Sequence, residues 1–196
     1  MEKFTKVKKS QEAQVQTDKD SIAYDGNYIK VINENDWEFT VESDSIVCLI
    51  YIKDEGYILM RSEPVPPWQY KHKNNVNKLS GHFLTLVSGT IEEGETPQKC
   101  LRRELYEEAG LVLNEFYNFE IEGPFFMSKA SSAQFYTCLL ELNYNEYKMV
   151  TAPGDGSKTE NVSKTIKISL GDIDEVRMND MISQYLITKL KKDYNV

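Results

Sequence analysis

Three glutamates in the stretch "CLRRELYEEAG" have a spacing that suits metal chemistry. Glu104, Glu107 and Glu108 stand at positions i, i+3 and i+4, which on an α-helix places their side chains on one face, about 6 Å apart. Like charges at this spacing destabilise an isolated helix, so another interaction must compensate. Clustered carboxylate oxygens are the ligands that hard divalent cations prefer. The pattern is therefore typical of a site for such a cation.

A solvated acidic face is the alternative interpretation. Arg102 and Arg103 stand beside the glutamates and would neutralise them at the surface of the helix. Taken alone, the glutamate triplet favours this simpler interpretation. Evidence for chemistry must therefore come from the surrounding residues.

The element that must position the glutamates is a helix predicted over residues 97–109. Thr96 suits the N-cap position, Pro97 suits the first helical position, and Gly110 suits the left-handed residue that ends a helix. An apolar stripe faces the predicted core and consists of Leu101, Leu105 and Ala109, with Cys100 beside it. The glutamates lie on a neighbouring face.

The residues around the helix complete a longer motif. Gly89 is followed after five residues by Glu95, and after seven more by "RELYEEAGL", which begins at Arg103. These residue types and gaps fill every position of the Nudix box, and a motif of this length with fixed gaps is far more specific than a short glycine pattern. The chain therefore resembles the Nudix hydrolases.

The resemblance implies a loop-helix-loop that holds Mg²⁺ or Mn²⁺ and cleaves a pyrophosphate between a nucleoside and a second group. Carried onto this sequence, Glu104 and Glu108 are the principal metal ligands. Glu107 contributes a ligand or orients water, and the carbonyl oxygen of Gly89 is a further ligand. The chain is thus expected to be a metal-dependent pyrophosphohydrolase.

A catalytic set is also implied by the resemblance, and comprises Glu107, Glu108, Arg103 and Glu160. Arg103 would hold the carboxylates in place through charge-assisted hydrogen bonds. Glu160 lies in "APGDGSKTENV", a late glycine-containing loop, where a general base is expected. Asp155 is the second candidate for the base, and an ordinary exposed loop acid is the alternative role for Glu160.

Flanking segments resemble the branch of the family that hydrolyses ADP-ribose and other ADP-sugars. The similar segments are "DGNYIKVINENDWEFTV" and "ENVSKTIKISLGDIDEVRMNDMISQYLITKL", and with the box they cover residues 21–190. ADP-ribose or a related nucleotide sugar is the implied substrate, with AMP and ribose 5-phosphate as products. Members of that branch are usually homodimers, so a homodimer is implied.

Three departures from that branch concern the substrate contacts. "MRSEPVP" keeps Arg61 but lacks a second arginine, "TLVSG" has Thr85 where the branch has glutamate, and "MSKASSAQ" keeps a serine. Other nucleotide substrates therefore stay open: a nucleoside triphosphate, a dinucleoside polyphosphate or capped RNA. A binding module without hydrolysis is a further alternative, although such modules generally lose box glutamates. The predicted substrate-binding residues are Arg61, Trp68, Ser128 and Lys129.

The rest of the chain is predicted to form one α/β domain. Residues 1–20 are polar and are expected to be a flexible arm, residues 21–45 a small antiparallel strand region, and residues 46–196 the Nudix domain. Strands before and after the central helix, with a closing helix over 179–192, predict an α/β/α sandwich with a mixed sheet. Residues 64–82 are proline-rich and polar and are expected to form a long loop, which contains Trp68.

Composition limits the partners. The chain has 196 residues with 40% hydrophobic and 28% charged, and a net charge of −8. This acidic balance argues against broad nucleic-acid or membrane binding. No apolar run has the length of a membrane span and no secretory signal opens the chain, so a cytoplasmic protein is expected. A small anionic nucleotide would need a metal cation between its phosphate groups and this acidic protein in order to bind.

Overall fold

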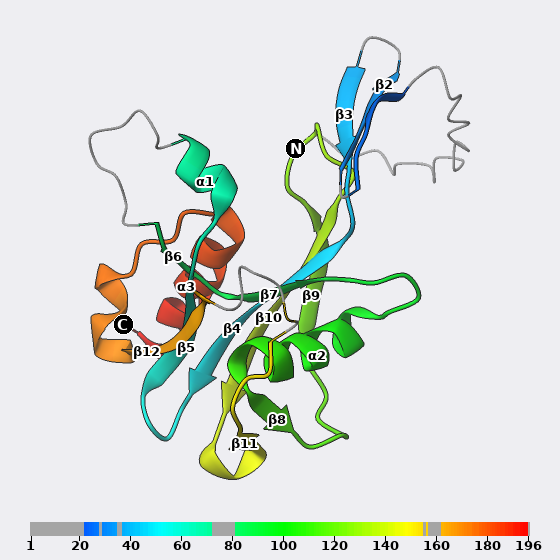
Figure 1. The fold of residues 1–196 in the computed structure, drawn as a ribbon. Coiled ribbons are helices and arrows are strands. Elements are labelled where there is room, and N and C mark those ends of the chain that lie inside the picture. The colour runs from blue at the N-terminus through cyan, green and yellow to red at the C-terminus, as the bar shows by residue number, and fades with distance from the viewer. Residues whose placement is uncertain are drawn as a thin grey trace, which may run out of the picture.

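The computed structural model of the protein describes residues 22–27, 29–34, 37–71, 81–154, 156 and 162–195. Its centre is a seven-stranded sheet in the order β12-β5-β4-β10-β9, with β6 paired to β5 and β7 paired to β4 (Figure 1). Only the β4–β10 pair is parallel among these pairs, so the sheet is mixed, as predicted. The strands are β4 (Ser45–Ile52), β5 (Tyr57–Glu63), β6 (Phe83–Thr85), β7 (Val87–Thr90), β9 (Ile121–Phe126), β10 (Gln134–Leu142) and β12 (Lys164–Ser169).

Two helices cover opposite faces of this sheet, α2 (Pro97–Ala109) and α3 (Met181–Tyr194). Strand β4 is almost continuously apolar because it lies in the middle and is buried on both faces. Alternate side chains such as Ile46 and Ile50 pack in the cluster that contains Leu105 of α2. Their neighbours, such as Leu49, pack with Leu186 of α3. The predicted α/β/α sandwich is confirmed.

Helix α2 begins and ends at the residues that its sequence predicts. The side chain of Thr96 accepts a hydrogen bond from the backbone N–H of Lys99. Gly110 adopts the left-handed conformation with φ 62°, which favours glycine. A Cβ at this position would also lie 2.1 Å from the carbonyl oxygen of Val150. Both ends of the glutamate-bearing helix are therefore fixed by local chemistry.

Helix α3 begins two residues later than the predicted 179–192, because Asp180 is its N-cap. The Asp180 carboxylate accepts a hydrogen bond from the backbone N–H of Ser183. Glu122 of β9 links this helix to the sheet, since it accepts hydrogen bonds from the Tyr185 hydroxyl and the Lys189 ammonium, both at 2.6 Å. These bonds lower the pKa of Glu122, the Lys189 bond having the larger effect.

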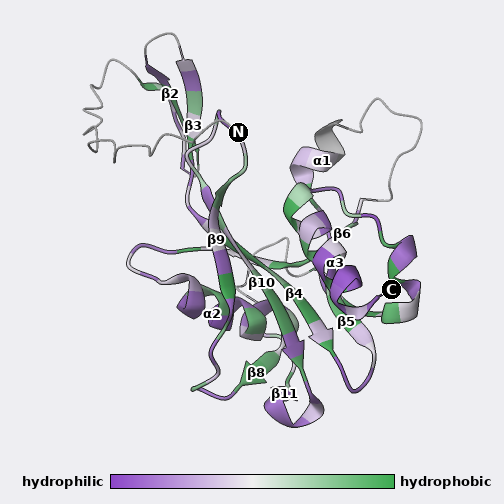
Figure 2. Cartoon of the chain, turned by 180° about the vertical axis from the view of Figure 1, so that it is seen from behind, coloured by the Kyte–Doolittle hydropathy of each residue, from purple (hydrophilic) through white to green (hydrophobic). Residues whose placement is uncertain are grey.

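A separate three-stranded antiparallel sheet precedes the main sheet. It consists of β1 (Ile22–Asp25), β2 (Lys30–Glu34) and β3 (Trp37–Val41), and it stands away from the helices (Figure 1). The backbone N–H groups of Thr40 and Ser132 donate hydrogen bonds of 2.9 Å to the carbonyl oxygens of Ala130 and Thr40, respectively. The hydrophobic core lies in the main sheet, along strands such as β4 and β10 (Figure 2). The predicted arm 1–20 lies outside the described residues.

Several short elements differ from the sequence prediction. The predicted loop 64–82 contains the short helix α1 (Pro66–Lys71), and residues 72–80 lie outside the described part of the chain. "FLTLVS" divides into β6 and β7, because the chain there leaves β5 and pairs with β4. Unpredicted elements are β8 (Leu111–Leu113), β11 (Tyr147–Met149) and two 3₁₀-helices, η2 (Tyr144–Glu146) and η4 (Leu170–Glu175). None of the described helices has the length and apolar composition to span a membrane.

Candidate active site

Strand β7 and helix α2 bring the ends of the sequence motif together. Gly89 pairs with Ile46 of β4 and lies directly against the side chain of Glu104. A Cβ built at Gly89 would lie 2.0 Å from Oε1 of Glu104, so only glycine permits this approach. Glu104 is 8% exposed. The spacing between the first glycine of the motif and this glutamate therefore corresponds to a physical contact between strand β7 and helix α2.

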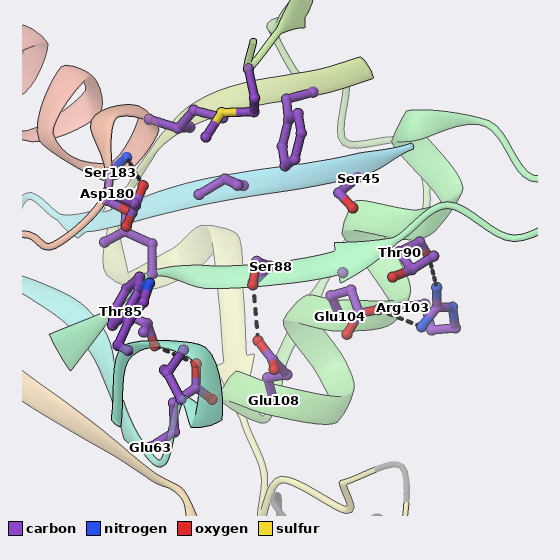
Figure 3. Close-up of a pocket in the computed structure, with 18 of the residues that line it drawn as sticks. Ser45, Glu63, Thr85, Ser88, Thr90, Arg103, Glu104, Glu108, Asp180 and Ser183 are labelled. Carbon is purple, nitrogen blue, oxygen red and sulfur yellow. Dashed lines mark hydrogen bonds and ion pairs between the residues drawn. The ribbon is translucent and has the colours of Figure 1, made fainter. Parts of the chain in front are cut away.

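Arg103 connects the motif's acidic residues. Its Nη1 donates to Oε1 of Glu104 at 2.6 Å and to Oε2 of Glu107 at 3.2 Å. Its Nη2 donates to Oε2 of Glu95 and to the carbonyl oxygen of Thr90, both at 3.1 Å, and Figure 3 shows the contact with Thr90. The hydrogen bond from Arg103 lowers the pKa of Glu95 and raises that of Arg103. The guanidinium of Arg103 thus links the loop that contains Glu95 and the end of strand β7 to helix α2.

Glu108 has a different environment, although it lies on the same helix. Its side chain is turned toward β7, where Oε2 accepts a hydrogen bond of 3.1 Å from the backbone N–H of Ser88 (Figure 3). Oε1 lies 3.8 Å from Nη2 of Arg61. Glu108 is 9% exposed, and burial raises its pKa to about 8 in spite of the Arg61 charge. Burial therefore disfavours the ionised form of this carboxylate.

Arg61 is buried rather than presented to a ligand in the main pocket. It is 4% exposed, and its Nη1 donates to the carbonyl oxygen of Glu108 at 2.8 Å. The Thr165 hydroxyl donates to the same oxygen at 2.9 Å. Arg61 lines a smaller cavity of about 270 Å³ together with Glu107 and Gly154. Arg61 therefore binds the backbone of the last turn of α2.

The main pocket has a volume of about 770 Å³ and lies where β4 and β10 begin and β5 ends (Figure 3). Glu107 borders the smaller cavity instead. Ser128 and Lys129 are exposed and are not among the described lining residues. Glu160 lies outside the described residues, as does Asp155. The predicted site residues that line the main pocket are Trp68, Gly89, Arg103, Glu104 and Glu108.

Sequence reasoning missed several polar residues of this pocket. Glu63 accepts a hydrogen bond of 2.6 Å from the hydroxyl of Thr85, and both line the pocket. Thr85 was visible in the sequence as a departure from the ADP-sugar branch, but its partner was not. Asp180 and Ser183 approach from the start of α3, where the only sequence signal was an acid before a helix. Ser88 contributes a backbone N–H, which no residue type reveals.

Comparison with known proteins identifies the family. A family model described as NUDIX domain matches residues 43–173. The chain belongs to the Nudix family. A solved structure entitled "Crystal structure of ADP compounds hydrolase" is similar to this Nudix hydrolase with a TM-score of 0.61 and 14% sequence identity, covering 88% of this chain and 91% of that chain. At this identity the likeness concerns the fold. A search of curated proteins finds no match.

Nudix hydrolases generally use divalent metals, and the donors of this site suit such an ion. Glu104, Glu108 and the Gly89 carbonyl offer only oxygen, which hard cations prefer. Burial raises the pKa of Glu108, and a nearby cation would favour its ionised form. Within the described residues, however, no three His, Cys, Asp or Glu side chains are grouped so that they could hold a metal. Glu104 and Glu107 each contact Arg103 through one carboxylate oxygen, and a carboxylate has a second oxygen with which a metal can interact.

The Gly89 contact leads to a prediction for Gly89→Ala. The new methyl group would overlap the Glu104 carboxylate, whose nearest atom lies 2.0 Å from the Cβ position. Because Gly89 is not among the glycines with positive φ, we expect the variant to fold and to move Glu104 away from β7. Hydrolysis should fall by roughly a hundredfold or more, as for other displaced catalytic groups. Activity assays and circular dichroism would measure both effects, and wild-type turnover would contradict the expected role of this contact.

Proposed function

We propose that this Nudix hydrolase uses Mg²⁺ or Mn²⁺ to hydrolyse the pyrophosphate bond of a nucleoside diphosphate linked to another moiety. ADP-ribose or a related nucleotide sugar is the leading substrate, and ADP-ribose would yield AMP and ribose 5-phosphate. The observation that carries the proposal is the pair of buried glutamates, Glu104 and Glu108, in one pocket of about 770 Å³. That volume suits a ligand of nucleotide size.

The residues have distinct roles in this proposal. The carboxylates of Glu104 and Glu108 and the carbonyl oxygen of Gly89 hold the metal, with Glu107 contributing a ligand or orienting water. The metal supplies charge neutralisation on the phosphate oxygens and lowers the pKa of bound water. Arg103 keeps the carboxylates in position through the hydrogen bonds described above. Glu160 remains the proposed general base.

Support for the substrate class comes from the pocket and from the similar structure. Trp68 lines the pocket and makes an edge contact with Phe83, with ring centroids 5.1 Å apart, so its indole is held in place. The similar solved protein is described as a hydrolase of ADP compounds. A nucleoside triphosphate, dinucleoside polyphosphate or capped RNA is the alternative substrate, because Thr85 stands where the ADP-sugar branch has glutamate.

Substrate profiling tests the proposed class. We expect release of AMP and ribose 5-phosphate from ADP-ribose in the presence of Mg²⁺, with a higher kcat/KM than for diadenosine polyphosphates or nucleoside triphosphates. ADP-glucose and NADH complete the panel, and product analysis by chromatography identifies the bond that breaks. A preference for nucleoside triphosphates would move the enzyme to another substrate class. Absence of turnover with every compound and both metals would favour the binding-module alternative.

Replacement of Glu108 by Gln tests the metal role separately from the substrate. We expect Glu108→Gln to lower kcat by orders of magnitude while the fold is retained, because the amide keeps the shape but loses the charge that the metal needs. Mg²⁺ should raise the Tm of the wild-type protein in a concentration-dependent way and should raise that of the variant much less. Glu93→Gln, in the exposed turn before α2, is the matched control. Unchanged turnover in Glu108→Gln would refute the metal role.

We further propose that the enzyme is a homodimer and that the small N-terminal sheet takes part in the interface. Within the described residues, no helix covers this sheet (Figure 1). Tyr24 and Trp37 are 59% and 55% exposed on it. Large apolar side chains on an uncovered sheet are a feature of protein interfaces. Their burial against a second copy would remove this surface from water.

Light scattering coupled to size exclusion tests the dimer. We expect a mass about twice that of the 22.7 kDa chain, and we expect Trp37→Glu to shift the protein toward the monomer, since a charge buried in an interface is unfavourable. Lys53→Glu, at the β4–β5 turn of the main domain, is the control and should leave the mass unchanged. A wild-type monomer at micromolar concentration would contradict the proposal.

A further inference from the structure

The main pocket has two sides of different chemistry (Figure 3). Arg103 and Glu104 lie on one side, and Asp180, Thr85 and Glu63 lie on the other. Among the described lining residues, Arg103 is the only one with a positive charge. The side formed by the end of β5, strand β6 and the start of α3 therefore carries two carboxylates without a lining cation, and we call it the acidic side.

Asp180 is fixed in orientation on the acidic side. Its Oδ1 accepts a hydrogen bond of 2.7 Å from the backbone N–H of Ser183, which caps helix α3. Among the described residues, no donor contacts its Oδ2. The cap holds the carboxylate still, and its second oxygen remains able to accept a hydrogen bond from a ligand in the pocket.

Glu63 provides a second acceptor on the same side. Its Oε1 accepts the hydrogen bond from the Thr85 hydroxyl, and its Oε2 lies 3.8 Å from Nε of Arg61, beyond hydrogen-bonding distance. An ionised carboxylate accepts hydrogen bonds and donates none. The acidic side is therefore built to receive several donors from a ligand.

These features select among the parts of a nucleotide sugar. A phosphate group would face two carboxylates, of which Glu63 has the buried Arg61 at 3.8 Å, and the repulsion would disfavour it. The edge of a nucleobase presents donors and acceptors in alternation, whereas the carboxylates supply only acceptors. Sugar hydroxyls can all donate, and acidic residues accept hydrogen bonds from ribose hydroxyls in other nucleotide-binding proteins. The ribose of the nucleoside carries a base, which would then also lie on the acidic side. The sugar attached to the second phosphate carries hydroxyl groups and no base, so it fits this side better.

We infer that Asp180 is a specificity-determining residue that accepts hydrogen bonds from the hydroxyl groups of the sugar attached to the distal phosphate. This inference rests on the proposed function and names the part of the substrate that occupies the acidic side. Trp68, Leu86 and Ile182 line the same pocket and offer apolar surface to the sugar's C–H groups. Removal of the second Asp180 oxygen should therefore affect only substrates that carry this sugar.

Asp180→Ser tests the inference against two substrates. Serine caps helices about as well as aspartate, so the variant keeps the cap and loses Oδ2. Asp180→Asn also keeps the cap and replaces Oδ2 with a donor. For ADP-ribose, we expect kcat/KM to fall roughly tenfold or more in both variants, the effect of losing a hydrogen bond to a charged acceptor. For the β-methyl ester of ADP, which keeps the pyrophosphate but lacks the sugar, kcat/KM should remain that of the wild type.

Asp172→Ser is the matched control, because Asp172 is an exposed acid of η4 that does not line the pocket. It should leave kcat/KM unchanged for both substrates, and thermal melts should show that all variants fold. An equal fall on the two substrates would overturn the inference alone. A fall that disappears with hypoxanthine in place of adenine would assign Asp180 to the base and would also overturn it. Hydrolysis of neither substrate by the wild type would overturn the proposed function and the inference together.

Discussion

The site depends on the guanidinium of Arg103, which keeps like charges together along helix α2. Glu104 and Glu107 would repel each other across the turn that separates them, yet both accept hydrogen bonds from the same Nη1. The other end of the guanidinium reaches Glu95 and the carbonyl oxygen of Thr90. Because Arg presents several donors in a planar fork, one side chain can join the loop, β7 and α2. The acidic cluster is therefore compatible with a folded chain.

The central sheet determines what surrounds this cluster. Because β4 is buried on both faces, α2 and α3 must pack on opposite sides of it. Residues of both helices then border one pocket, with Glu104 contributed by α2 and Asp180 by the start of α3. A pocket built in this way combines residues that are about 75 positions apart in the chain.

Electrostatics gives the pocket its chemical character. Glu108 is buried and has a raised pKa of about 8, and Arg61 offsets its charge only in part, at 3.8 Å. In the proposed function, a divalent cation offsets the negative charge of this pocket and of a protein with net charge −8, so that a phosphate anion can bind. The same reasoning explains why the acidic side suits hydroxyl groups, since a carboxylate accepts their hydrogen bonds without facing another negative charge.

The sequence alone determined the helix that carries the glutamates, the strands on both sides of it and the family. These features depend on local signals: Thr96 and Gly110 fix the ends of α2, and the box spacing reflects the contact of Gly89 with Glu104. Tertiary structure alone decided that Arg61 is buried beneath α2, that Ser128 and Lys129 are exposed and not among the described lining residues of the pocket, and that Glu63, Thr85 and Asp180 all line it. Such placements arise from the packing of distant strands and helices, which residue types and short-range spacing do not encode.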